Sequence, residues 1–111
     1  MIEKTILDYL NSQLTVPVYM EIPPDPPELF VVIERTSGGM ENWINRSMFA
    51  IQSYAPTLYE AAELNELVKE AMLQAVMLQE LASVRLNSEY NYTDTSTKQY
   101  RYQGVYDVVH Y

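Results

Sequence analysis

The chain has 111 residues, of which 15 are acidic, seven are basic and none is cysteine, and its net charge is −8. This length predicts a single domain over residues 1–111 that buries about two-thirds of its surface on folding. The acidic balance disfavours tight binding to a phosphate backbone. The lack of cysteine excludes disulfides, thiolate nucleophiles and Cys-ligated zinc sites.

The first ten residues, MIEKTILDYL, are amphipathic and carry two acids, which is not the pattern of a signal peptide. No apolar run approaches the roughly 20 residues that a membrane-spanning helix needs. We therefore expect a soluble intracellular product without a membrane partner.

Residues 1–14 have apolar side chains at helical spacing, which predicts a first helix with one buried stripe. The stripe consists of Ile2, Ile6, Leu7, Leu10 and Leu14. Pro17 ends this helix, because a proline disfavours helical backbone at the residue before it. The segment PVYMEI then predicts a short strand, and PPDPPE predicts a stiff, extended connection.

The apolar run from Leu29 to Ile33 predicts a strand that is covered on both faces. We expect this strand to be the central one of the sheet, and we expect Gly38 and Gly39 to break it. The segment NWINRSMFAIQSYA predicts the third strand, with Phe49 and Ile51 on one face.

Trp43 lies at the start of the predicted third strand, beside the glycines. An exposed tryptophan at this position would be an anchor for an interface. The favoured interpretation is that Trp43 caps the edge of the core, and both interpretations are kept.

The segment from Ala55 to Leu81 predicts a long helix that begins with a capping box of Thr57 and Glu60. Its apolar stripe consists of Leu64, Leu67, Val68, Ala71, Met72, Ala75 and Leu78. Between residues 71 and 78 apolar side chains nearly encircle the helix, so we expect a neighbouring subunit to cover part of it. An acidic row follows the opposite side, and its plain interpretation is a solvated face. The row consists of Glu60, Glu63, Glu66 and Glu70.

Residues 84–93 and 98–111 both alternate between two faces, and the polar turn TDTST lies between them. This pattern predicts a long C-terminal β-hairpin. A register in which paired residue numbers sum to 192 matches Val84 with Val108, Leu86 with Tyr106, Arg85 with Asp107, Tyr90 with Tyr102 and Tyr92 with Tyr100. The same register places Ser88 opposite Gly104, where a bulge or a close backbone approach is expected.

Ten residues of this hairpin measure about 34 Å, which is the expected diameter of the whole domain. Its distal end therefore lies at the rim, and tyrosine is enriched where proteins meet. We predict an intersubunit surface there, made by Tyr90, Tyr92, Tyr100 and Tyr102.

Residues that carry chemistry are scarce in this chain. His110 is the only histidine, so no ordinary zinc site is expected. The segment TSGGM is too short for a phosphate-binding loop, and Ser37 has no histidine near it in the sequence. We expect no catalytic residue, no metal, no cofactor and no enzymatic activity.

The expected fold is α+β, with two helices packed on a mainly antiparallel sheet of about five strands in the order α-β-β-β-α-β-β. In this order, the landmarks VPVYMEIPPDPPELFVVIER, GG, IQSYAPTLYEAAELNELVKEAM and the terminal YRYQGVYDVVHY resemble the small tail-terminator, or tail-completion, proteins of long-tailed bacteriophages. The likeness covers nearly the whole chain.

The resemblance implies a non-enzymatic virion protein that is made in the cytoplasm of the host bacterium. Such a protein forms a hexameric ring with itself at the head-proximal end of the tail, stops polymerisation of the tail tube and joins it to the head connector. DNA only passes through the lumen. Six copies carry about 6 × −8 = −48 charges, and a lumen lined by the acidic row Glu60, Glu63, Glu66 and Glu70 would repel DNA rather than hold it.

The sequence is also compatible with two alternatives. The first is a module that binds single-stranded nucleic acid by stacking bases on the four hairpin tyrosines, with Arg85, Lys98 and Arg101 as the nearby bases. The second is a small acidic regulatory protein that binds one host partner as a monomer.

Overall fold

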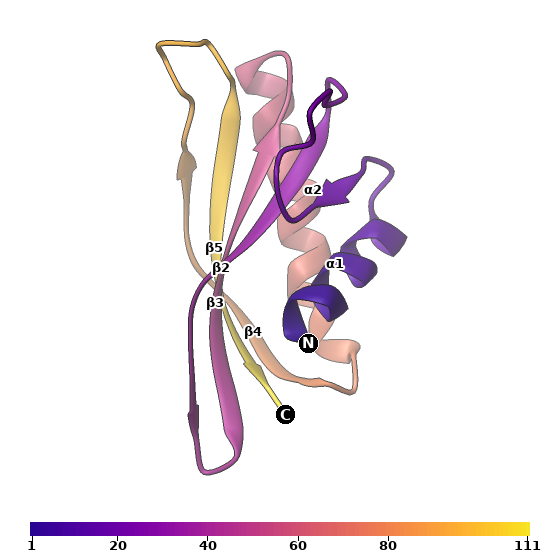
Figure 1. Ribbon diagram of the computed structural model, residues 1–111, viewed down its shortest axis with the longest axis vertical. Helices are drawn as coiled ribbons and strands as arrows, with labels where there is room; N and C mark the ends of the chain where they lie inside the picture. Colours follow the sequence, from indigo (N-terminus) through magenta and orange to yellow (C-terminus); the bar gives the residue numbers. More distant parts are fainter.

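The computed structural model describes all 111 residues and shows two helices beside a twisted five-stranded sheet (Figure 1). The elements are, in chain order, α1 (Ile2–Gln13), β1 (Val18–Tyr19), β2 (Phe30–Glu41), β3 (Ile44–Tyr54), α2 (Leu58–Gln74), the 3-10 turn η1 (Ala75–Met77), β4 (Leu81–Asn91) and β5 (Arg101–His110). The predicted α+β class, the element order and the C-terminal strand pair are confirmed.

The strands follow the order β1-β2-β3-β5-β4, and only the β1–β2 pair is parallel. Both helices lie on one side of the sheet, so the other face is not covered by a helix (Figure 1). We call that uncovered side the open face. The expectation that β2 is the central strand is wrong, because β3 occupies the middle of the order.

The apolar run in β2 nevertheless has cover on both sides. Val31 and Ile33 belong to the main core under the helices, whereas Phe30 and Val32 form a small second cluster with Tyr54 on the open face. A doubly covered strand therefore need not be central, since aromatic neighbours in the same sheet supply the second cover.

The main core joins both helices to the middle of the sheet. Its fully buried members include Ile6 and Leu10 of α1, Val68 and Met72 of α2, and Phe49 of β3. The predicted stripe of α1 is confirmed at Ile2, Ile6 and Leu10, which are buried. The predicted placement of Phe49 and Ile51 on one buried face of β3 is also confirmed.

The expectation that Gly38 and Gly39 end β2 is wrong. Both glycines pair with β3, neither has a positive φ, and the strand continues to Glu41. The chain turns instead at Asn42 and Trp43, whose φ angles are 52° and 66°. Two consecutive left-handed residues make a tight hairpin turn whose twist matches the flanking strands.

Helix α2 begins as predicted, since the Thr57 hydroxyl accepts a hydrogen bond of 3.2 Å from the Glu60 amide. It ends earlier than predicted, because the helical bonding stops at Gln74 and residues 75–77 form a 3-10 turn. Neither α1 nor α2 has the length and apolar character of a helix that crosses a membrane.

Candidate interaction surfaces

The C-terminal hairpin keeps the predicted register only in its first half. Val84 pairs with Val108, Arg85 with Asp107 and Leu86 with Tyr106. A β-bulge between Leu86 and Ser88 then shifts the pairing by one residue, so that Tyr90 lies opposite Gln103 and Asn91 opposite Tyr102. The predicted Tyr90–Tyr102 pair is therefore wrong, although a bulge at this point of the hairpin was expected.

The bulge also changes which face each later residue of β4 occupies, because successive side chains of a strand alternate between faces. Tyr90 shares the open face with Gln103 and Gln52, whereas Tyr102 pairs with Ser53 on the helix side. Tyr92 and Tyr100 lie just outside the ends of β4 and β5. The four hairpin tyrosines thus do not form one surface.

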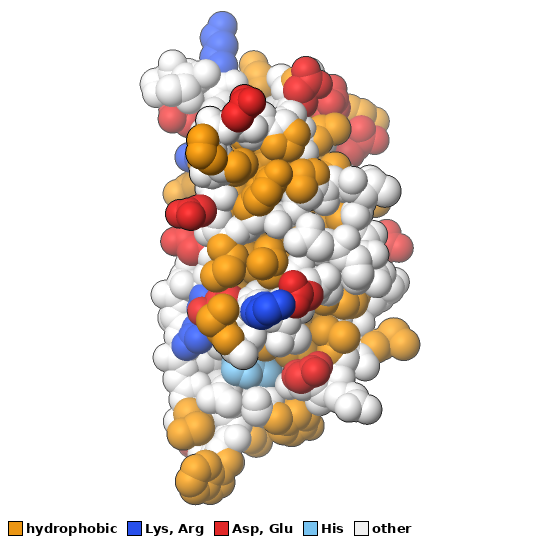
Figure 2. Space-filling model, turned by 45° about the vertical axis from the view of Figure 1, so that its right-hand side comes forward, with side chains coloured by type: hydrophobic (Ala, Val, Ile, Leu, Met, Phe, Trp, Pro, Cys, Tyr) orange, Lys and Arg blue, Asp and Glu red, His pale blue; other side chains and the backbone are white.

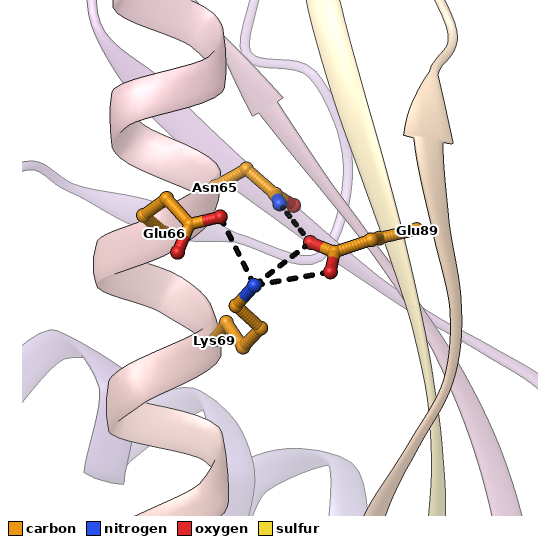
Figure 3. Close-up of polar contacts among 4 residues, drawn as sticks. All are labelled: Asn65, Glu66, Lys69 and Glu89. Atoms are coloured by element: carbon orange, nitrogen blue, oxygen red, sulfur yellow. Dashed lines mark hydrogen bonds and ion pairs between the residues drawn. The ribbon is translucent and has the colours of Figure 1, made fainter.

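Glu89 is turned toward α2 by the same shift, and it meets two side chains of that helix (Figure 3). The Asn65 amide donates to Glu89 at 2.8 Å, and the Lys69 ammonium contacts the Glu89 carboxylate at 3.0 Å and Glu66 at 3.0 Å. The hydrogen bond to Glu66, followed by that to Glu89, raises the pKa of Lys69. The only sequence feature that indicates this contact is the small Ser88–Gly104 pair near the bulge.

The open face carries an arginine held between two tyrosine rings. The guanidinium carbon of Arg101 lies 4.7 Å from the ring centre of Tyr92 and 5.8 Å from that of Tyr54. Arg101 also donates from Nε to the Tyr92 carbonyl at 2.7 Å. Tyr54 in turn stacks on Phe30 with ring centres 4.5 Å apart.

A second polar line crosses the open face beside that arginine. Gln52 donates to Gln103 at 2.6 Å, and Gln103 donates to the Tyr90 hydroxyl. The Tyr90 ring meets Tyr92 edge-on at 6.0 Å. Gln52, Gln103 and Tyr92 line a shallow concavity of about 610 Å³, which is also lined by Met20, Glu21 and Ile22.

Trp43 projects from the β2–β3 turn with 86% of its surface exposed, so the interpretation that it caps the core edge is wrong. Met40 and Ile44 beside it are also exposed. In Figure 2 hydrophobic side chains form the lowest point of the molecule, where Figure 1 places this turn. The turn therefore presents an apolar tip to solvent.

The acidic row of α2 faces outward on the single chain. Glu63, Glu66 and Glu70 are exposed, and Glu60 is half-buried. Several apolar side chains of the same helix region are exposed as well, namely Leu67, Leu73, Val76 and Met77. Figure 2 brings this helix-bearing side forward and shows hydrophobic and acidic side chains interspersed over its upper half.

A hollow of about 230 Å³ lies between the end of α1, the start of β2 and the first half of α2. Its apolar lining consists of Val16, Leu29, Leu64 and Leu67, and its polar lining of Thr15, Glu60 and Glu63. Leu67 was predicted to lie on the buried stripe, but 54% of it is exposed at this hollow.

His110 lies 2.9 Å from the Ser47 hydroxyl through its Nε2 atom. Burial is the main cause that lowers the pKa of His110 below its usual value. The structure forms no group of three or more His, Cys, Asp or Glu side chains with the geometry of a metal site.

No protein-family model matches the chain, and a comparison with curated proteins finds no match either.

Proposed function

We propose that this chain is a ring-forming structural subunit of a long-tailed bacteriophage, placed at the head-proximal end of the tail. In this role six copies terminate the tail tube and join it to the head connector, and DNA passes through the lumen. The proposal combines the resemblance of the sequence to tail-terminator proteins with the surfaces that a single copy leaves uncovered.

The observation that carries the proposal is that unlike surfaces of one chain lack cover. The sheet has helices on one face only, and its open face carries the arginine and tyrosine side chains of β4 and β5. The β2–β3 turn presents Trp43 at another place on the molecule. Unlike patches that bind each other join copies head to tail, and such contacts close into rings when the rotation permits.

The acidic row of α2 is proposed to contribute to the wall of the lumen. Lys69 neutralises part of this row through its contact with Glu66, whereas Glu63 and Glu70 form no salt bridge. A lumen with this charge would keep DNA from adhering as it passes.

The ring is tested by light scattering after size-exclusion chromatography and by negative-stain microscopy. We expect a mass of about six chains and rings with a central hole. A chain that remains monomeric at every accessible concentration, and does not assemble on the end of isolated tail tubes, contradicts the proposal.

A second candidate function is binding of single-stranded nucleic acid on the open face. The observation that favours it is that Arg101 and the exposed rings of Tyr92 and Tyr90 lie together on the open face, as stacking platforms do. The net charge of −8 opposes it. Micromolar, salt-sensitive binding of a labelled oligonucleotide, measured by fluorescence anisotropy, would favour this candidate over the ring.

A further inference from the structure

We propose that Trp43 of one copy inserts into the hollow between α1 and α2 of a neighbouring copy. This inference rests on the proposed ring, and it names the contact that joins one subunit to the next. Both halves of the contact are present on every chain, so the partner is a second copy of this protein.

The donor half is the apolar tip of the β2–β3 hairpin. Trp43 is 86% exposed, Met40 is 63% exposed and Ile44 is 39% exposed. Glu41 pairs with Ile44, so strand pairing continues up to the two turn residues and fixes the position of the tip. Tryptophans of this kind, which bury about 150–250 Å² on contact, are the residues that most often dominate an interface.

The acceptor half is the hollow of about 230 Å³. Leu29, Leu64 and Leu67 give it apolar walls that suit the body of an indole ring. Glu60 and Glu63 also line it. A buried tryptophan needs one acceptor for its only polar group, the Nε1–H, and either carboxylate supplies it.

A chain cannot fill its own hollow with its own Trp43. Strand β3 has 11 residues and is therefore about 37 Å long, and it separates the turn from the start of α2. Helix α2 returns toward the turn by only about 9 Å before it reaches Leu64. The contact must therefore join two copies through unlike patches, which is the head-to-tail geometry that generates a ring.

The hairpin tip carries one acid, Glu41, and one base, Arg46, and the base can meet the acids of the hollow. Arg46, three residues after Trp43, is exposed and takes part in none of the salt bridges of the single chain. Glu60 and Glu63 of the hollow form no salt bridge either. In this arrangement Glu60 and Glu63 lie at the contact between copies, and Glu66 and Glu70 remain as the part of the row that faces the lumen.

The contact is tested by crosslinking, because the natural chain has no cysteine. One chain carries Ile44→Cys, which leaves Trp43 in place, and the other carries Glu63→Cys. A short bismaleimide is expected to join them efficiently. The matched control replaces Glu63→Cys with Thr97→Cys, an exposed position at the far hairpin tip, and is expected to give only background product. Adding Trp43→Asn to the first chain should abolish the specific product, since asparagine suits the positive φ of the turn and removes the indole.

Emission of Trp43 gives an independent measure, because it is the only tryptophan. We expect its emission to shift to the blue as the concentration rises and copies associate, and we expect Tyr111→Ser, a change at another exposed aromatic residue, to leave that shift intact. The inference is overturned if Ile44→Cys and Glu63→Cys crosslink no more strongly than the control pair. It is also overturned if an oligonucleotide causes the blue shift while the chains do not associate with each other. Rings that persist with Trp43→Asn overturn the inference and leave the proposed function standing. Specific crosslinking without rings supports the contact and tells against the hexamer.

Discussion

Gly104 of β5 is expected to be a position where a single methyl group destabilises the fold. A Cβ atom built on Gly104 would lie 2.8 Å from the hydroxyl oxygen of Tyr106 and 2.9 Å from its Cε2 atom. Tyr106 is fully buried in the main core, so its ring cannot move away without displacing its neighbours. Overpacking of this kind costs about 1–3 kcal/mol.

The Gly104→Ala variant should therefore unfold at a lower urea concentration, with a melting temperature lower by about 4–8 °C for each kcal/mol. Gly39→Ala is the matched control, because a Cβ on Gly39 meets nothing within 4 Å and its φ is not positive. Both changes add the same methyl group and remove the same backbone freedom of the unfolded chain. Their difference isolates the contact with Tyr106, and equal midpoints for the two variants would refute the reasoning.

Three further changes test other parts of the structure. Tyr106→Phe should leave the free energy of unfolding in urea unchanged or raise it, because the buried hydroxyl has no hydrogen-bond partner and such groups cost about 1–3 kcal/mol. Thr57→Ala should lower it by about 1 kcal/mol through loss of the α2 cap, whereas Thr57→Ser should keep the cap. Burial lowers the pKa of His110 below its ordinary value of 6.5. As the pH falls, the unfolded chain therefore takes up the proton at a higher pH than the folded chain does. The free energy of unfolding should decrease as the pH falls below 6.5. Urea titrations from pH 7.5 downward should show a smaller decline for His110→Gln, and an NMR titration of the single histidine that gives a raised pKa would contradict the prediction.

The helices and the first half of the hairpin follow from local patterns in the sequence. The spacing of Ile2, Ile6 and Leu10 suits one buried helical stripe only. Thr57 with Glu60 marks the start of α2 through a bond between neighbouring residues. Val84 and Leu86 of β4 are apolar, so they belong on the face of the sheet that packs against the core. This requirement sets their pairing with Val108 and Tyr106 of β5.

The wrong predictions in the β2–β3 hairpin, a strand end at Gly38 and Gly39 and a core-capping Trp43, have a common cause. Glycine permits a turn but does not require one, and the glycines of β2 keep ordinary strand pairing with Ser47 and Arg46. The real turn uses Trp43 at a φ of 66°, a conformation that tryptophan rarely adopts. The residue types at the turn therefore do not form a usual hairpin signal. Without the position of the turn, the exposure of Trp43 could not be predicted either.

The bulge in β4 was located only approximately because tyrosine suits either face of a sheet. Its ring packs against apolar neighbours while its hydroxyl reaches water or a polar partner. The unbroken alternation through Tyr90 and Tyr92 is therefore compatible with both registers. What separates the registers is the contact of Glu89 with Asn65 and Lys69 of α2, which lie 24 and 20 residues away in the sequence.

The one-residue shift that turns Glu89 toward α2 also divides the hairpin tyrosines between two surfaces. Tyr90 joins Tyr92 and Arg101 on the open face, whereas Tyr102 lies on the helix side. A partner that covers the open face therefore contacts Tyr90 without necessarily contacting Tyr102. Replacement of both tyrosines together would merge two separate effects on assembly, and only the single Tyr90→Ser and Tyr102→Ser variants can assign a subunit contact to one face of the sheet.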